Sequence, residues 1–148
     1  RLFITAYPKA VAPPYSSVYL DKGGLIWGPS TGEVARLYEA AGLRLSDDFH
    51  DIPDHIAAEL EFASCLISKH LEEQRDGPPA AESLTHLQRR FCVEHLFRWA
   101  PAFFQHVGES SAGTFYGTMA QVAAQFTAWD AERSEQGGSG DVEEEARL

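Results

Sequence analysis

Apolar side chains along this chain recur every three or four residues, which is the spacing of helices that bury one face. The clearest repeat lies near the C-terminus, where Phe115, Met119, Val122, Phe126 and Trp129 are separated by steps of 4, 3, 4 and 3 residues. Such a stripe is more typical of a packed core face than of a cofactor site, so we expect it to be buried. No convincing strand-like alternation occurs in the sequence. The pattern predicts helices over about 31–41, 54–74, 80–98, 100–108 and 111–132.

The segment before these helices is irregular. Its prolines exclude a helix over residues 4–29, and its glycine pairs mark turns. From Gly137 onward, a Gly-Gly-Ser-Gly run and a cluster of acids read as an unfolded end. We therefore predict an all-α fold with a single compact helical domain over 1–133, about five helices after the irregular segment, and a disordered acidic tail over 134–148.

Charge narrows the possible partners. The 148 residues carry a net charge of −10. An acidic chain repels phosphate backbones, which argues against nucleic acid, and it favours basic peptides. No apolar run reaches the ~18 residues of a membrane helix, and no secretory signal opens the chain. We therefore expect no membrane insertion and a cytoplasmic location.

The residues that usually carry chemistry do not form an active site in the sequence. Cys65 and Cys92 lie in apolar helical patterns without a CxxC spacing, so they are interpreted as reduced core residues. Gly23–Gly28 lacks the lysine of a phosphate-binding loop. His55 and Glu59 are half of a metal-binding helix pattern, without its second histidine. The sequence thus predicts no metal, no cofactor and no catalytic residue.

One carboxylate stands out. Glu59 falls inside the apolar arc of the predicted helix 54–74, between Leu66 and Ala63. This arc is centred near Ile56, Leu60, Ala63, Ile67 and Leu71, and Leu66 and Phe62 extend it on one side. A buried carboxylate needs a partner, and His55 one turn earlier is the nearest candidate, followed by an arginine elsewhere in the chain. Asp54 and Glu61 are expected on the opposite side.

The surroundings of Glu59 are also acidic. No lysine or arginine occurs between Arg44 and Lys69, a stretch that holds Asp47, Asp48, Asp51, Asp54, Glu59 and Glu61. An acidic zone beside aromatic residues is a plausible seat for a cationic segment. The alternative is that these acids cap a helix and face water.

Several separated motifs, in order, resemble the TorD/DmsD/NarJ group of redox-enzyme maturation chaperones. They span about residues 1–130 and are Arg1-Leu2-Phe3, the Pro13–Asp21 segment, Gly28, Pro53-Asp54-His55 followed by Glu59–Phe62, the His95–Phe103 segment, and Phe115-Tyr116.

This resemblance implies an all-helical, non-catalytic protein. It would bind the twin-arginine signal peptide and apo form of a molybdenum-cofactor oxidoreductase until the cofactor is inserted and the enzyme is exported. Carried over by motif, the peptide-binding residues are Asp54, His55, Pro14, Tyr15, Leu2, Phe3 and Gly28, and Glu59 joins them as the buried acid.

Family members usually carry further helices before the Arg-Leu-Phe motif, whereas this sequence begins at that motif, so it is interpreted as a C-terminal portion of the full family domain. We therefore expect an exposed apolar groove where those helices would pack, and a possible homodimer formed by helix exchange. Two other functions remain open from the residues alone. One is a metal-dependent hydrolase that uses His55 and Glu59, and the other is a structural interaction subunit of a redox complex.

Overall fold

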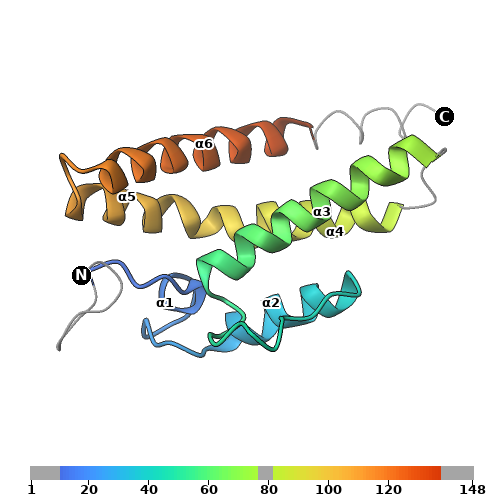
Figure 1. Ribbon diagram of the computed structural model, residues 1–148, viewed down its shortest axis with the longest axis horizontal. Helices are drawn as coiled ribbons and strands as arrows, with labels where there is room; N and C mark the ends of the chain where they lie inside the picture. The colour runs from blue at the N-terminus through green and yellow to red at the C-terminus, as the bar shows by residue number, and fades with distance from the viewer. Residues whose placement is uncertain (1–10, 77–81, 138–148) are drawn as a thin grey trace. The chain divides into compact units, whose positions relative to one another are not determined.

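The computed structural model describes residues 11–76 and 82–137 of the chain (Figure 1). Every element in these ranges is helical, and the only strand-like pairing among them is an isolated bridge between Tyr15 and His55. The predicted all-α fold class is therefore confirmed, and the five predicted helices correspond to α2–α6. The elements are α1 (Ser16–Leu20), α2 (Pro29–Ala40), α3 (Ile56–Asp76), α4 (Glu82–Glu94), the 3-10 turn η1 (Leu96–Arg98), α5 (Ala100–Ser110) and α6 (Phe115–Gly137).

The short helix α1 was not predicted. It lies inside the segment interpreted as irregular, directly after Pro13 and Pro14. Both prolines precede the helix, so neither interrupts its hydrogen bonds. Its first turn is held by a distant group, because the backbone N–H of Ser17 donates to the Asp54 carboxylate. A helix that depends on such a tertiary contact leaves no local periodicity in the sequence.

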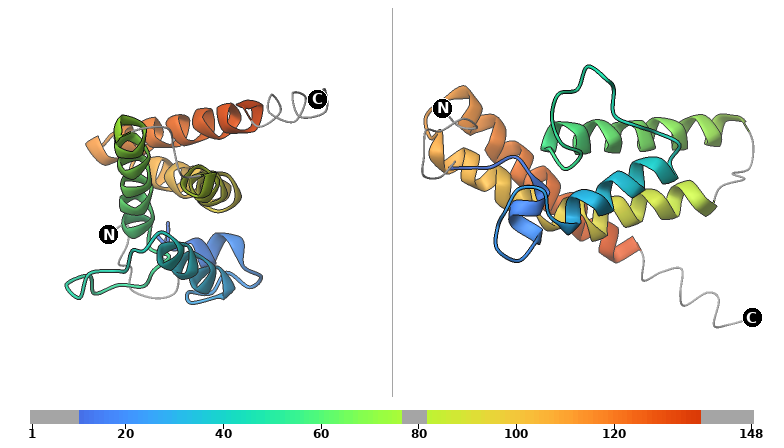
Figure 2. Two further views of the ribbon diagram at one scale, coloured as in Figure 1. Left: turned by 90° about the vertical axis from the view of Figure 1, so that its right-hand side faces the viewer. Right: turned by 90° about the horizontal axis from the view of Figure 1, so that it is seen from below.

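The chain divides into two compact units. Residues 13–99 form the α1–α4 unit, in which α3 and α4 run antiparallel side by side, α2 packs on α4 and α1 packs on α2 (Figures 1 and 2). The second unit contains α5 and α6, which form an antiparallel hairpin (Figure 1). Most of the predicted peptide-binding residues belong to the α1–α4 unit.

Aromatic rings fill the core of the α1–α4 unit. The Tyr38 ring of α2 lies 4.6 Å from the Phe62 ring of α3, and Phe62 lies 4.7 Å from Phe91 of α4, centroid to centroid. Phe91 and Trp99 have no exposed surface. Burial of such large apolar side chains stabilises a fold by about 2–3 kcal/mol each, so this ring series holds α2, α3 and α4 together.

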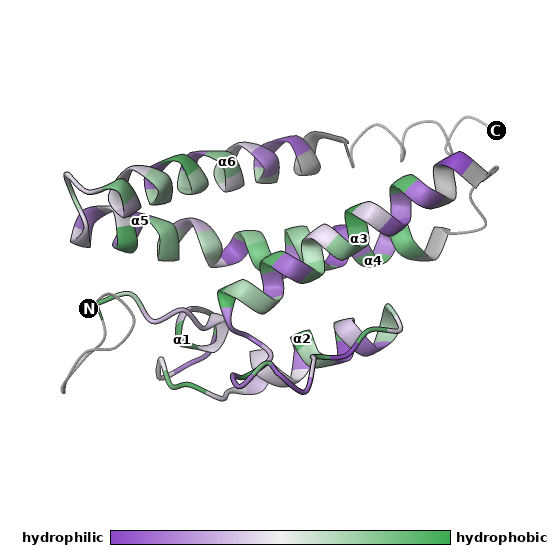
Figure 3. Cartoon of the chain, viewed as in Figure 1, coloured by the Kyte–Doolittle hydropathy of each residue, from purple (hydrophilic) through white to green (hydrophobic). Residues whose placement is uncertain are grey.

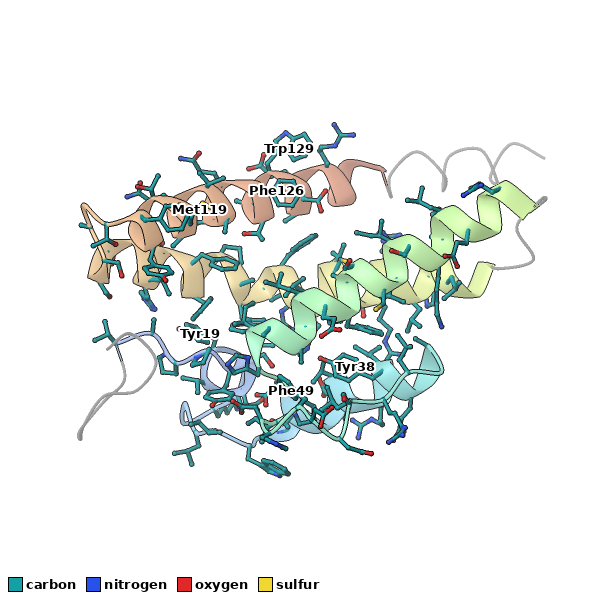
Figure 4. The ribbon with its side chains drawn as sticks, in the orientation of Figure 1. Tyr19, Tyr38, Phe49, Met119, Phe126 and Trp129 are labelled. Atoms are coloured by element: carbon teal, nitrogen blue, oxygen red, sulfur yellow. The ribbon has the colours of Figure 1, made fainter. Side chains whose placement is uncertain are left out.

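The stripe predicted to be buried on α6 is exposed, which corrects the sequence interpretation. Its five members, Phe115, Met119, Val122, Phe126 and Trp129, retain between 52% and 72% of their accessible surface. Apolar positions alternate with polar ones along α6 in Figure 3, and Figure 4 shows Trp129 projecting away from α5.

Small residues on the opposite side of α6 explain this result. Gly117, Ala120, Ala124 and Thr127 form a small-residue face, on which Ala120 and Thr127 are buried. A Cβ atom on Gly108 of α5 would lie 3.3 Å from the Gln121 side chain and 3.7 Å from the Gly117 carbonyl. The two helices thus approach closely through glycine and alanine, and the large side chains are left on the far side of α6.

The buried face of α3 agrees with the prediction on one side only. As predicted, Ile56, Glu59, Phe62 and Leu66 are buried, but Leu60, Ile67 and Leu71 are exposed, and Ala58, outside the predicted arc, is buried. The buried arc is therefore rotated by roughly a quarter of a turn from the centre that the apolar positions indicated. Its direction is set by α2 and α4, which contact α3 through Phe62.

Two further sequence inferences bear on the fold. Within the described residues, no helix has both the length and the apolarity needed to cross a membrane. Cys65 and Cys92 are partly buried and are not joined in a disulfide. The predicted tail beyond Gly137 and the segment 4–10 lie outside the described residues, and α6 extends a few residues past its predicted end.

Candidate functional site

Two segments far apart in the sequence meet at the start of α3. The backbone N–H of Ile56 donates to the Pro14 carbonyl at 2.8 Å, and that of Ser16 donates to the Asp54 carbonyl at 2.9 Å. These bonds flank the bridge between Tyr15 and His55. The structure therefore brings together four of the predicted site residues: Pro14, Tyr15, Asp54 and His55.

Asp54 is fully buried beneath this junction. Its Oδ2 atom accepts a 2.9 Å hydrogen bond from the Ser17 backbone N–H, while its Oδ1 atom has no hydrogen-bond partner among the described residues. The expectation that Asp54 faces outward with Glu61 is thus wrong for Asp54, although Glu61 is exposed. The carboxylate is drawn inward because the first turn of α1 leaves backbone N–H donors that need an acceptor.

The exposed side of the junction carries a different carboxylate. Asp51 Oδ2 lies 3.4 Å from the Tyr15 hydroxyl and 3.9 Å from His55 Nε2. The ring of His55 stands edge-on to Tyr15, with centroids 5.4 Å apart, and lies 6.2 Å from Phe49. We call this group, formed by Tyr15, Phe49, Asp51 and His55, the acidic turn face.

The protonation of His55 is set by this environment. Its Nδ1 atom accepts a 3.1 Å hydrogen bond from the Ala57 backbone N–H, which leaves Nε2 as the N–H that points toward Asp51. Partial burial lowers the pKa of His55 below its usual 6.5, an effect that the negative charges of Asp51 and Asp54 oppose in part. The imidazole is therefore neutral at pH 7, so His55 gives Asp51 no positively charged partner.

Gly28 closes the loop between α1 and α2. Asp21 accepts hydrogen bonds from the Ser30 backbone N–H at 3.1 Å and from the Ser30 hydroxyl at 2.6 Å. A Cβ atom on Gly28 would collide with the Asp21 carboxylate, so a larger residue would displace this carboxylate from Ser30. The glycine lets the loop close tightly in front of α2.

Glu59 forms a separate, fully buried centre. Its Oε1 atom lies 2.9 Å from His95 Nε2, and its Oε2 atom accepts a 2.9 Å hydrogen bond from Trp99 Nε1. Burial raises the pKa of Glu59, while the bonds to His95 and Trp99 act in the opposite direction. The nearby Glu59 charge also adds to the burial that raises the pKa of Tyr38.

The predicted burial of Glu59 is confirmed, but its predicted partner is wrong. His55 lies before the first residue of α3 and faces Asp51, whereas Glu59 turns toward the end of α4. His95 and Trp99 flank η1, and both belong to the His95–Phe103 segment noted in the sequence. Nothing within that segment indicates a contact with α3, so the pairing with Glu59 left no sequence signal.

The remaining predictions on the site are limited by the described range. Leu2 and Phe3 lie outside the described residues. Within that range, no group of three histidine, cysteine, aspartate or glutamate side chains is arranged to hold a metal ion. Both carboxylate oxygens of Glu59 are bonded within the core, so His55 and Glu59 do not converge on a common ligand position.

Known proteins with similar sequences agree with the resemblance. A chaperone protein TorD from Aliivibrio salmonicida is 32% identical over 122 residues, which cover 82% of this chain and 56% of that protein. A chaperone protein TorD from Photobacterium profundum is 31% identical over 133 residues, which cover 88% and 59% respectively. The chain thus spans a little over half the length of these relatives. The nitrate reductase delta subunit family, which contains the TorD and NarJ proteins, matches residues 1–105, and this chain belongs to that family.

Proposed function

We propose that this chain acts in the cytoplasm as a maturation chaperone, which binds the twin-arginine signal of an apo molybdenum-cofactor oxidoreductase and holds it until cofactor insertion and export. The family and the chaperone names of its relatives support a role in molybdoenzyme maturation. The observation that carries the proposal is the acidic turn face, where an exposed carboxylate lies among three aromatic rings.

This face has the chemistry that an arginine requires. A guanidinium group can donate two parallel hydrogen bonds to the Asp51 carboxylate. It can also stack on the rings of Tyr15 or Phe49, because its planar cation is weakly hydrated. An ammonium group lacks both the paired donors and the stacking surface, so we expect arginine to be preferred over lysine.

The other predicted residues have supporting roles in this proposal. Asp54 and Pro14 hold the two segments in register through the bonds to Ser17 and Ile56, and the buried Asp54 carboxylate lies beneath the exposed face. Gly28 fixes the loop before α2. Glu59 supports the start of α3 from inside, and Leu2 and Phe3 are proposed to contact the apolar part of the signal.

The test is a titration of the chain with a twin-arginine signal peptide and with its Lys-Lys variant. We expect the Lys-Lys peptide to bind about tenfold more weakly, and Asp51→Asn to weaken arginine binding by a similar factor, because each change removes a charge-assisted hydrogen bond. Asp47→Asn is the matched control, since Asp47 is already paired with Arg44 at 3.3 Å. Absence of binding, or binding that is indifferent to salt and to Asp51→Asn, would refute the proposal.

Acid should weaken the same complex. As the pH falls through the pKa of His55, which burial holds below its usual value, His55 gains a proton and places a positive charge beside the arginine position. The affinity should therefore decrease between pH 7 and pH 5, and His55→Gln should remove most of this dependence. Titrations of both proteins at several pH values measure the effect, and an affinity that rises on acidification would contradict it.

A further inference from the structure

Next to the acidic turn face, the α1–α4 unit contains an open pocket of about 350 Å³ between α3 and the loop that follows α2. Its floor is formed by Tyr38, Ala58 and Phe62, and its walls include Leu45, Phe49 and Cys65. The lining is mainly apolar, and Figure 4 shows Tyr38 and Phe49 together beneath α3. A pocket of this size lies at the lower end of the range for small ligands, so it fits one or two side chains rather than a folded partner.

The pocket is braced by polar contacts at its edges. The Tyr38 hydroxyl donates to the Pro53 carbonyl at 2.8 Å, and Lys69 Nζ donates to the Ala41 carbonyl at 2.8 Å. In the loop itself, the backbone N–H of Phe49 donates to the Ser46 carbonyl at 3.0 Å. These bonds hold the loop over α3 while the space between the apolar side chains stays open.

The charged residues at the edge of the pocket indicate which kind of segment it could bind. Glu61 is exposed at the rim, and Arg44, the only cation of the lining, is engaged by Asp47 at 3.3 Å. Phe49 is shared between the pocket wall and the acidic turn face, since its ring lies 6.2 Å from His55. An apolar side chain in the pocket would thus belong to a segment whose neighbouring residues are basic.

We propose that this pocket receives one large apolar side chain of the client's signal segment, close in sequence to the arginines bound at the acidic turn face. This inference rests on the proposed function and adds a determinant of specificity to it. The arginines account for charge recognition, and the pocket selects among basic segments by the size and apolarity of one neighbouring residue. Burial of such a side chain contributes enough free energy to change the affinity by about tenfold or more.

Cys65 reports directly on the pocket because its side chain forms part of the wall. In the Cys92→Ala background, we would measure the rate at which a maleimide labels Cys65, with and without a peptide that carries two arginines followed by phenylalanine. The expected result is at least a tenfold slower labelling with this peptide, and little protection by the same peptide with serine in place of phenylalanine.

A filled pocket provides the second measurement. Cys65→Phe should weaken binding of the phenylalanine peptide by about tenfold and leave binding of the serine peptide nearly unchanged. Ser64→Phe, at the exposed neighbouring position of α3, is the control. Circular dichroism would check that both variants are folded. If Cys65→Phe does not fold, the labelling experiment still tests the proposal.

The outcomes separate the two proposals. Peptide binding that depends on Asp51 but neither protects Cys65 nor distinguishes phenylalanine from serine overturns the pocket and leaves the chaperone function intact. If a peptide without arginines protects Cys65 equally well, the pocket binds apolar side chains independently of the arginines. This result overturns the proposed link between the pocket and the signal segment. A chain that binds none of the peptides overturns both proposals.

Discussion

Helices α3 and α6 bury different kinds of side chain. On α3 a carboxylate is buried together with Phe62 and Leu66, while other large apolar side chains of the same helix are exposed. On α6 the aromatic stripe is exposed, and glycine and alanine face α5. In both helices the apolar period is real, but the packed face is chosen by the neighbouring helix. A hydrophobic stripe therefore identifies a helix more reliably than it identifies the buried side of that helix.

The sharpest test compares one phenylalanine from each helix. Phe62→Ala should lower the free energy of unfolding by about 3–5 kcal/mol, because the ring is 4% exposed and packs between Tyr38 and Phe91. Phe126→Ala should change it by about 0.5 kcal/mol or less, because that ring is exposed. Urea unfolding followed by circular dichroism measures both, and similar losses in the two variants would contradict the contrast between the helices.

The buried acid of α3 gives the next largest effect. Glu59→Ala should cost about 1–3 kcal/mol, since it removes the acceptor of the Trp99 Nε1–H bond and the partner of His95 in a site without water access. Glu61→Ala, two residues along on the exposed side, is the matched control and should be nearly neutral. A neutral Glu59→Ala would mean that the buried contacts do not stabilise the unit.

The pH dependence of this site has a defined sign. Burial raises the pKa of Glu59 in the folded state above its ordinary 4.5, so folding favours the protonated acid. Its contribution to stability is full below the unfolded pKa and is lost as the pH rises through the folded pKa, by about 1.4 kcal/mol for each unit of elevation. The stability of the wild type relative to Glu59→Gln should therefore fall between pH 4 and pH 7. Unfolding curves across this range test the sign, and a relative gain in stability would reverse it.

The small-residue face of α6 supports the third comparison. Ala120→Leu should destabilise the α5–α6 unit by about 1–3 kcal/mol, because a larger side chain overpacks a buried position. Ala102→Leu makes the same change at an exposed position of α5 and should be tolerated. Thermal unfolding distinguishes them, and equal effects would indicate that Ala120 is not in the helix interface.

The sequence predicted the helices and part of the site for identifiable reasons. Helical periods, prolines and glycines are local signals, so α2–α6 were predicted to within a few residues. The motif that contains Pro14 and Tyr15 and the one that contains Asp54 and His55 were linked only by resemblance, and the structure joins them through backbone bonds.

Other features depend on contacts between distant residues. The pairing of Glu59 with His95 and Trp99 spans 36 and 40 residues, which no helical wheel of α3 can reveal. The inward position of Asp54 likewise depends on its contact with the first turn of α1, 37 residues away in the sequence. The spacing of Gly117, Ala120, Ala124 and Thr127 was present in the sequence and would have indicated the second face of α6.

Substitutions in the exposed stripe of α6 have the smallest expected effect on folding. They test whether the stripe takes part in self-association. Met119→Ser combined with Phe126→Ser should change the unfolding free energy by about 0.5 kcal/mol or less, since both side chains are more than half exposed. Exposed apolar surface of this kind marks interaction sites in proteins. If the stripe takes part in the possible homodimer predicted from the sequence, sedimentation equilibrium should show a weaker self-association in the double variant. Thr118→Ser is the control on the same helix. A loss of 2 kcal/mol or more at low protein concentration would instead mean that the stripe is covered within one chain.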